Sequence, residues 1–351
     1  MIKKAIQIAA AYVGTVVGAG FATGQEIMQF FTIYGEKSFY AVLLTTVLFI
    51  VLGIRIMELG KCCGSSSYGD ITEGFFGKKI GKIVNLFMML ALIVTTAAML
   101  AGAGALFEEQ FSIPLLLGVF FTGILTVLTI IAGIKGLMSV NVIFVPIMVL
   151  FSCILMLFTL WYHNHDPVVI QYQPVTIYQL VNTSLMYVSF NIILSIGVLG
   201  PLGSAIRDKK PIILGGVLGG LILGVLIASS NYCMLVHSPE IFEFEIPIVY
   251  MVLAMGSGFH LFYSLVVWGE IFTTLIASVF SLVKFFQRIF KSRLILSVGI
   301  VAISYMISRL GFSRIVGSLY PVIGFIGLIF MILILSPSYL NKMRQRKNGE
   351  I

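Results

Sequence analysis

Ten apolar segments follow one another along this 351-residue chain, and each is long enough to cross a lipid bilayer. A helix needs about 20 apolar residues to span the hydrocarbon core. The chain is only 10% charged, whereas a soluble domain carries about 25% charged residues. We therefore predict an all-α, polytopic membrane protein that forms a single domain, 1–351. The expected transmembrane spans are 5–32, 39–59, 81–107, 113–132, 140–162, 177–205, 211–236, 258–284, 293–309 and 315–336.

The basic residues predict the orientation of these spans. With the N-terminus inside, only Lys37, Arg309 and Arg314 of the 22 lysines and arginines fall on the outer side. Cytoplasmic loops carry such an excess of basic residues. We therefore expect a protein of the cell membrane with both termini in the cytoplasm and a basic tail, 337–351. The net charge of +8 then reflects topology, so no nucleic-acid partner is expected.

The stretch TVVGAGFATGQE, residues 15–26, predicts a break in the first span. Gly18 and Gly20 lie two residues apart and cannot share a helix face, and polar residues follow at once. Broken backbone survives in a membrane only where it lines a cavity enclosed by protein. The break would leave carbonyl groups at the end of one half-helix, which suit a cation, and amides at the start of the next, which suit an anion. A zwitterion and its driving ion need that pairing.

The sixth span carries a second candidate break. Ser189 and Asn191 flank Phe190 at mid-membrane depth, and Gly197 and the Gly200-Pro201 pair follow. Interrupted spans in corresponding positions of two halves are a sequence sign of a transporter binding site.

Spans one and six each begin a set of five helices. We therefore predict two repeats, about 5–162 and 177–336, which are inverted in the membrane because five is an odd number. A different glycine pattern, Gly216, Gly220 and Gly224, recurs every four residues on one helix face. That spacing predicts close helix packing and no break.

At these residues the chain resembles the amino acid–polyamine–organocation superfamily, whose transporters share a fold of two inverted five-helix repeats. The motifs GAGFATGQE and YVSFN are most similar to those of the YkvI-type bacterial membrane proteins within it. The similarity covers all ten spans in layout, whereas specific motifs are confined to spans one, six and eight. The resemblance implies that a solute lies between the broken helices one and six and faces helices three and eight.

The resemblance also implies roles for individual residues. The carbonyl groups of Gly14 and Val17 would bind a sodium ion together with the hydroxyls of Thr273 and Thr274. These hydroxyls could equally bond back to their own helix. The amides at the helix-one break would bind a carboxylate. The implied solute-binding residues are Gly18, Ala19, Gly20, Thr23, Thr95, Thr96, Ser189, Phe190 and Asn191.

Two acids, Glu26 and Glu270, depart from the sodium-site pattern. Ionisable groups within spans are costly and are functional candidates by default. A carboxyl group in a poorly solvated place can exchange protons near neutral pH. Proton coupling through Glu26 or Glu270 therefore competes with sodium coupling. A structural alternative for Glu26 is that an acid in the first turn of a half-helix stabilises that N-terminus.

For the remaining polar features we predict no role in binding or catalysis. The HNH sequence at 163–165 is expected to be a solvated turn, and the apolar stretch 246–253 a short helix lying on the outer side. No phosphate-binding GxxxxGK[ST] loop, metal-ligand spacing or nucleophile–base set occurs in the sequence, so neither an enzyme nor a cofactor is expected.

We predict a secondary active transporter, a symporter of a small zwitterionic solute such as an amino acid, driven by sodium or protons through alternating access. Its expected partners are the solute, the coupling ion and the lipid bilayer, and the sequence indicates no particular protein partner. The alternatives are a ligand-sensing membrane subunit on the same fold, similar to that of a germination receptor, and a passive channel. The sequence does not identify the solute.

Overall fold

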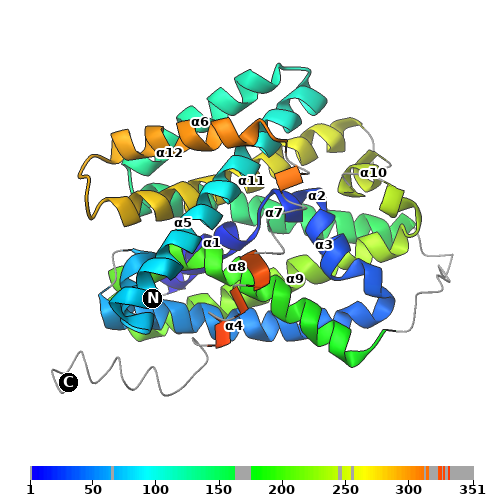
Figure 1. Ribbon diagram of the computed structural model, residues 1–351. Helices are drawn as coiled ribbons and strands as arrows, with labels where there is room; N and C mark the ends of the chain where they lie inside the picture. The colour runs from blue at the N-terminus through cyan, green and yellow to red at the C-terminus, as the bar shows by residue number, and fades with distance from the viewer. Residues whose placement is uncertain are drawn as a thin grey trace.

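The computed structural model describes residues 2–64, 67–162, 175–243, 247–253 and 257–311, and the short pieces 314–315, 323–325, 327–328 and 331–332. Within these ranges every element is a helix (Figure 1). The elements are α1 (Ile2–Val16), α2 (Ala19–Thr23), α3 (Gln25–Phe30), η1 (Thr32–Lys37), α4 (Ser38–Cys63), α5 (Tyr68–Phe111), α6 (Leu115–Ile131), α7 (Ile134–Tyr162), α8 (Ile177–Ala205), α9 (Lys209–Val236), η2 (Glu240–Glu243), α10 (Pro247–Leu253), α11 (Ser257–Phe286) and α12 (Arg293–Ser308).

The described helices agree with an all-α membrane protein. Six of them, α4, α5, α7, α8, α9 and α11, are long and apolar enough to cross a membrane, and α6 and α12 are shorter apolar helices. The first predicted span is divided among α1, α2 and α3. The predicted short helix within 246–253 is confirmed as α10. Most of the tenth predicted span, the tail 337–351 and the HNH sequence at 163–165 lie outside the described residues.

The interrupted first span lies at the centre of the helix arrangement. In Figure 1, α1 runs through the middle of the arrangement, with α4 below it and α11, α12 and α6 above it. Helix α1 packs against α7, α8, α9 and α11, and α4 packs along α8 and α9. Tyr12 is fully buried on α1, and its hydroxyl donates a 2.7 Å hydrogen bond to the carbonyl oxygen of Phe49. The first span is therefore surrounded by protein.

The glycine repeat of α9 packs against a neighbouring helix, as its spacing predicts. A Cβ atom on Gly216 would lie 2.5 Å from Ile54, and one on Gly220 would lie 2.5 Å from Ile50. Gly224 is equally close to Thr46, so all three glycines face α4. Small residues let helix backbones approach closely where no hydrophobic effect drives association.

The predicted break in the sixth span is wrong, because α8 is one continuous helix that includes Pro201. Two polar side chains in its second half bond to their own helix. Asn191 Nδ2 donates to the carbonyl oxygen of Tyr187 at 2.9 Å, and Ser195 Oγ donates to that of Asn191 at 2.7 Å. Its glycines allow close packing, since Gly197 lies against Ser281. Glycine in this helix therefore serves contact between helices and does not unwind the backbone.

Candidate functional site

The first span changes direction twice. Helix α1 ends at Val16, and Gly18 is extended, with φ −140° and ψ −166°, before α2 begins at Ala19. Five residues later Gly24 adopts φ +87°, a left-handed conformation that favours glycine, and α3 begins. The last carbonyl groups of α1 and the first amides of α2 lack helical partners. The interruption therefore presents unpaired backbone inside the protein.

Helix α11 covers this interruption with one face. Thr274 Oγ1 donates a hydrogen bond to the carbonyl oxygen of Val17, and a Cβ atom on Gly18 would lie 3.1 Å from the same hydroxyl oxygen. About three helical turns before Thr274, the Tyr263 hydroxyl donates a 3.0 Å hydrogen bond to the carbonyl oxygen of Ala22. The predicted neighbour Thr273 instead donates to the carbonyl oxygen of Glu270 in its own helix, at 2.9 Å.

Both acids singled out in the sequence are buried near this interruption. Glu26 and Glu270 are each only 5% exposed. The Glu26 carboxyl group lies against Gly20 of α2, and the Tyr187 hydroxyl of α8 donates a hydrogen bond to it. Glu270 lies between Tyr263 and Thr274 on the covering face of α11, and its charge would interact with that of Glu26.

Neither carboxyl group is fully paired. Oε2 of Glu26 and Oε2 of Glu270 have no hydrogen-bond partner, and neither acid forms an ion pair within the part of the chain that the structure describes. Two adjacent buried carboxylates would repel each other and would also lose their hydration. Ionisation of both acids at the same time is therefore unfavourable.

The other predicted solute residues mostly turn toward their own helices. Thr23 Oγ1 donates to Gly20 at 3.2 Å, Thr95 Oγ1 to Ala91 at 2.9 Å and Thr96 Oγ1 to Leu92 at 2.7 Å, in each case to the backbone carbonyl oxygen. Ser189 Oγ lies 2.8 Å from the carbonyl oxygen of Gly324 and 2.9 Å from that of Met186, and Phe190 is buried in the core. The contribution of α8 to the acid pair is thus Tyr187, the first residue of the YVSFN motif.

Sequence reasoning also missed Tyr263 and Asn141. Tyr263 stands seven residues before Glu270, which places both side chains on one helix face. This spacing could have identified Tyr263 from the sequence. Asn141 of α7 is fully buried, and a Cβ atom on Gly14 would lie 2.5 Å from its Oδ1. Asn141 is therefore the side chain that approaches Gly14, whose carbonyl group the resemblance assigned to a cation.

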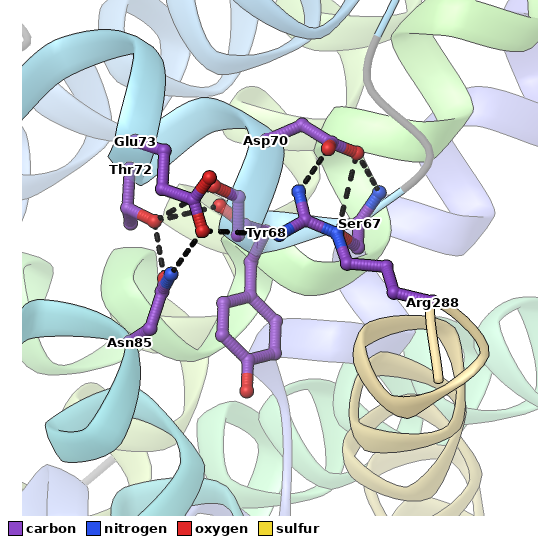
Figure 2. A network of polar contacts seen from close by, with 8 residues as sticks. Ser67, Tyr68, Asp70, Thr72, Glu73, Asn85 and Arg288 are labelled. Carbon is purple, nitrogen blue, oxygen red and sulfur yellow. Dashed lines mark hydrogen bonds and ion pairs between the residues drawn. The ribbon is translucent and has the colours of Figure 1, made fainter. Parts of the chain in front are cut away.

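A second polar cluster joins the start of α5 to the end of α11 (Figure 2). Arg288 pairs with Asp70 and, at 3.1 Å, with Glu73, whose carboxylate also accepts a 3.2 Å hydrogen bond from Asn85. The Asp70 side chain also caps α5, because it accepts a 2.9 Å hydrogen bond from the amide of Ser67. This cluster ties the start of α5 to the end of α11.

An aromatic contact supports these ion pairs. The Tyr68 ring stacks on Phe285 with centroids 4.6 Å apart and an interplanar angle of 10°. Burial raises the pKa of the Tyr68 phenol, and the positive charge of Arg288 offsets part of that rise. The phenol therefore stays protonated and neutral beside the arginine at physiological pH.

The fold defined by these helices is that of a known class of membrane transporters. The structure is similar to that of MhsT in complex with L-phenylalanine, with a TM-score of 0.74 and 15% identity, over 99% of this chain and 92% of that chain. Two variants of the manganese transporter of Eremococcus coleocola match with a TM-score of 0.60 and 12% identity, over 97% of this chain and 78% of theirs. The protein is thus a multi-pass membrane protein with a LeuT-like transporter fold.

Sequence comparison identifies the family. No protein-family model matches the chain. The chain is 33% identical over 342 residues to the membrane protein YkvI of Bacillus subtilis (strain 168), covering 93% of this chain and 94% of that protein. It is 26% identical over 339 residues to YyaD of the same organism, covering 94% and 96%. The chain therefore belongs to the YkvI family of membrane proteins.

Proposed function

We propose that the protein is a secondary active transporter that carries a small zwitterionic solute, an amino acid, in symport with sodium or protons. The observation that supports this most is the interrupted first span with the Thr274 hydroxyl at the Val17 carbonyl group and two buried acids beside it. The fold neighbours agree in kind: one was crystallised with L-phenylalanine, and the other is a manganese transporter.

The proposed topology has ten transmembrane helices in two inverted repeats, about 5–162 and 177–336, with both termini in the cytoplasm. One helix, the first, is interrupted. Alternating access would come from one group of helices rocking against the other around the site. The Arg288 cluster lies on the predicted cytoplasmic side. Its ion pairs would therefore break when the site faces inward and form when the site faces outward.

Glu26 sets a condition for binding a zwitterion. The amides of Gly18, Ala19 and Gly20 are the proposed donors to the solute carboxylate, yet the Glu26 carboxyl group lies against Gly20. An ionised Glu26 would repel the solute carboxylate at close range in a poorly solvated place. A proton on the acid pair, or movement of Glu26 away from Gly20, is therefore needed before the solute binds.

Two coupling ions fit different parts of the site. Sodium would bind the carbonyl oxygens of Gly14 and Val17 and the hydroxyl of Thr274, with Thr273 joining if its side chain rotates away from Glu270. Oxygen ligands of this kind suit a hard cation. A proton would bind the pair formed by Glu26 and Glu270. Neither sodium coupling nor proton coupling would need a further cofactor.

Transport by the purified chain in proteoliposomes tests this proposal. Mixed labelled amino acids are offered with a sodium gradient and a proton gradient imposed separately. Thr274→Ala should abolish sodium-driven uptake, with Thr126→Ala as the matched control because that hydroxyl is also buried but donates within its own helix, α6. Glu270→Gln should abolish proton-driven uptake.

The proposal fails if neither gradient drives uptake of any labelled amino acid. A solute that stabilises the purified protein against heat, yet is moved by no gradient, would instead favour the ligand-sensing subunit.

A further inference from the structure

Asn141 is a buried polar side chain without a visible partner. It is 0% exposed, and neither its Oδ1 nor its Nδ2 has a hydrogen-bond partner within the described residues. A buried amide that makes no hydrogen bond costs on the order of 1–3 kcal/mol. An asparagine flanked on α7 by apolar residues, in the sequence VNVIF, therefore indicates something that binds its polar atoms.

The position of Asn141 points toward the interruption of the first span. Its amide lies so close to Gly14 that a Cβ atom there would be 2.5 Å from Oδ1 and 2.7 Å from Cγ. Gly14 lies in the last turn of α1, where carbonyl groups lack helical amide partners. Only a residue without a side chain lets the Asn141 amide reach that backbone.

The register of α7 against α11 brings Asn141 to the level of Thr274. Phe144, one turn further along α7, lies against Gly269 and makes an edge contact with Phe272, with centroids 6.3 Å apart. The two helices run in opposite directions in the predicted topology, so one turn back on α7 corresponds to one turn forward on α11. Asn141 is therefore level with the turn of α11 that holds Thr273 and Thr274.

We propose that Asn141 Oδ1 is a ligand of a monovalent cation, together with the carbonyl oxygens of Gly14 and Val17 and the hydroxyl oxygen of Thr274. This assignment rests on the cation site of the proposed function and adds to it a ligand from α7. Helix α7 packs against both α1 and α11, so a ligand on it closes the third side of the site.

The chemistry of this ligand set favours sodium. All four oxygens are neutral, which matches a hard cation of single charge, whereas a transition metal would favour nitrogen or sulfur ligands. An ion needs little space, so a tightly packed junction of three helices is compatible with it. Bound sodium would stabilise the otherwise unpaired Oδ1.

A tryptophan at this junction supplies a probe. The chain has two tryptophans. Trp268 stacks on Phe272 at 5.3 Å and contacts Phe144 at 5.9 Å, whereas Trp161 is 79% exposed. In a Trp161→Phe background, Trp268 fluorescence is titrated with sodium chloride against choline chloride at constant ionic strength, using the full-length protein in detergent.

The background protein should show a saturable sodium response, and Asn141→Leu should weaken the apparent sodium affinity at least tenfold. Asn141→Asp keeps an oxygen at the same place and adds a charge, so it should bind sodium at least as tightly as the background does. Thr159→Val is the control, because Thr159 is also fully buried on α7 but lies near its other end.

Three results would overturn the assignment. Loss of the sodium response in Thr274→Ala but not in Asn141→Leu would leave the proposed cation site intact and remove Asn141 from it. Absence of any response in the background would remove the cation site itself, while proton-driven uptake could still support the proposed transporter. If Asn141→Leu does not fold, a sodium affinity tenfold weaker in Asn141→Asp than in the background would refute the ligand role.

Discussion

Gly60→Ala should destabilise the protein strongly, because two helix backbones meet at this glycine. A Cβ atom on Gly60 would lie 2.7 Å from both the carbonyl carbon and the Cα atom of Gly200 on α8. Carbon atoms in contact are normally about 3.5–4.0 Å apart. No side chain can rotate away, so α4 and α8 would have to separate by roughly 1 Å. Overpacking usually lowers the free energy of unfolding by about 1–3 kcal/mol. Because the new methyl group would meet main-chain atoms, we expect Gly60→Ala to cost about 3 kcal/mol or more.

Gly299→Ala is the matched control, and it should raise the free energy of unfolding instead of lowering it. Among the described residues, no atom outside the adjoining backbone of α12 lies within 4 Å of a Cβ placed on Gly299, which is in the interior of that helix. Alanine there gains helix propensity of up to about 1 kcal/mol. Equilibrium unfolding in mixed micelles of dodecyl maltoside and sodium dodecyl sulfate measures both changes in free energy. A loss below about 0.5 kcal/mol for Gly60→Ala, the range of an ordinary surface substitution, would refute the packing argument.

Two further substitutions test polar contacts of the site and of its closing cluster. Tyr263→Phe removes the donor to the buried Ala22 carbonyl oxygen, so the free energy of unfolding should fall by about 1–3 kcal/mol; an unchanged value would mean that this hydrogen bond adds nothing. Arg288→Gln removes ion pairs whose side chains are 29–35% exposed, so it should cost no more than about 1 kcal/mol at low salt. That difference should shrink as salt is raised, and a difference that salt does not alter would show that the loss comes from packing on Phe285 instead.

The sequence predicted the parts of this molecule that stand out against an apolar background. Long apolar runs predicted the helices, and a close glycine pair followed by an acid predicted where the first span would be interrupted. Glu26 and Glu270 were conspicuous for the same reason, since carboxylates are rare in membrane spans. Their placement around the same interruption depends on contacts between segments far apart in the chain, which a single sequence does not reveal.

The wrong prediction for α8 has a related cause. Glycine and proline lower helix stability in water, but in a membrane glycine lets helices approach closely and proline is tolerated within spans. Gly197 lies against Ser281 and Gly203 against Met57, so both glycines are explained by neighbours that local sequence does not contain. Asn141 was missed although it interrupts an apolar run, because it matched no motif. Only its closeness to Gly14 in the structure indicates a role at the interruption of the first span.

Helix α11 links the two proposed coupling sites, so the proposed sodium and proton sites would not act independently. One face of α11 holds Tyr263 at the carbonyl group of Ala22, Glu270 beside Glu26, and Thr274 at the carbonyl group of Val17. A displacement of α11 that releases Thr274 from Val17 would also change the separation of the two acids, because the helix moves as a unit. Loss of sodium would then alter how firmly the acid pair holds its proton, and protonation would alter the cation site. We therefore expect Glu270→Gln to change the apparent sodium affinity reported by Trp268, even though Glu270 is not among the proposed sodium ligands.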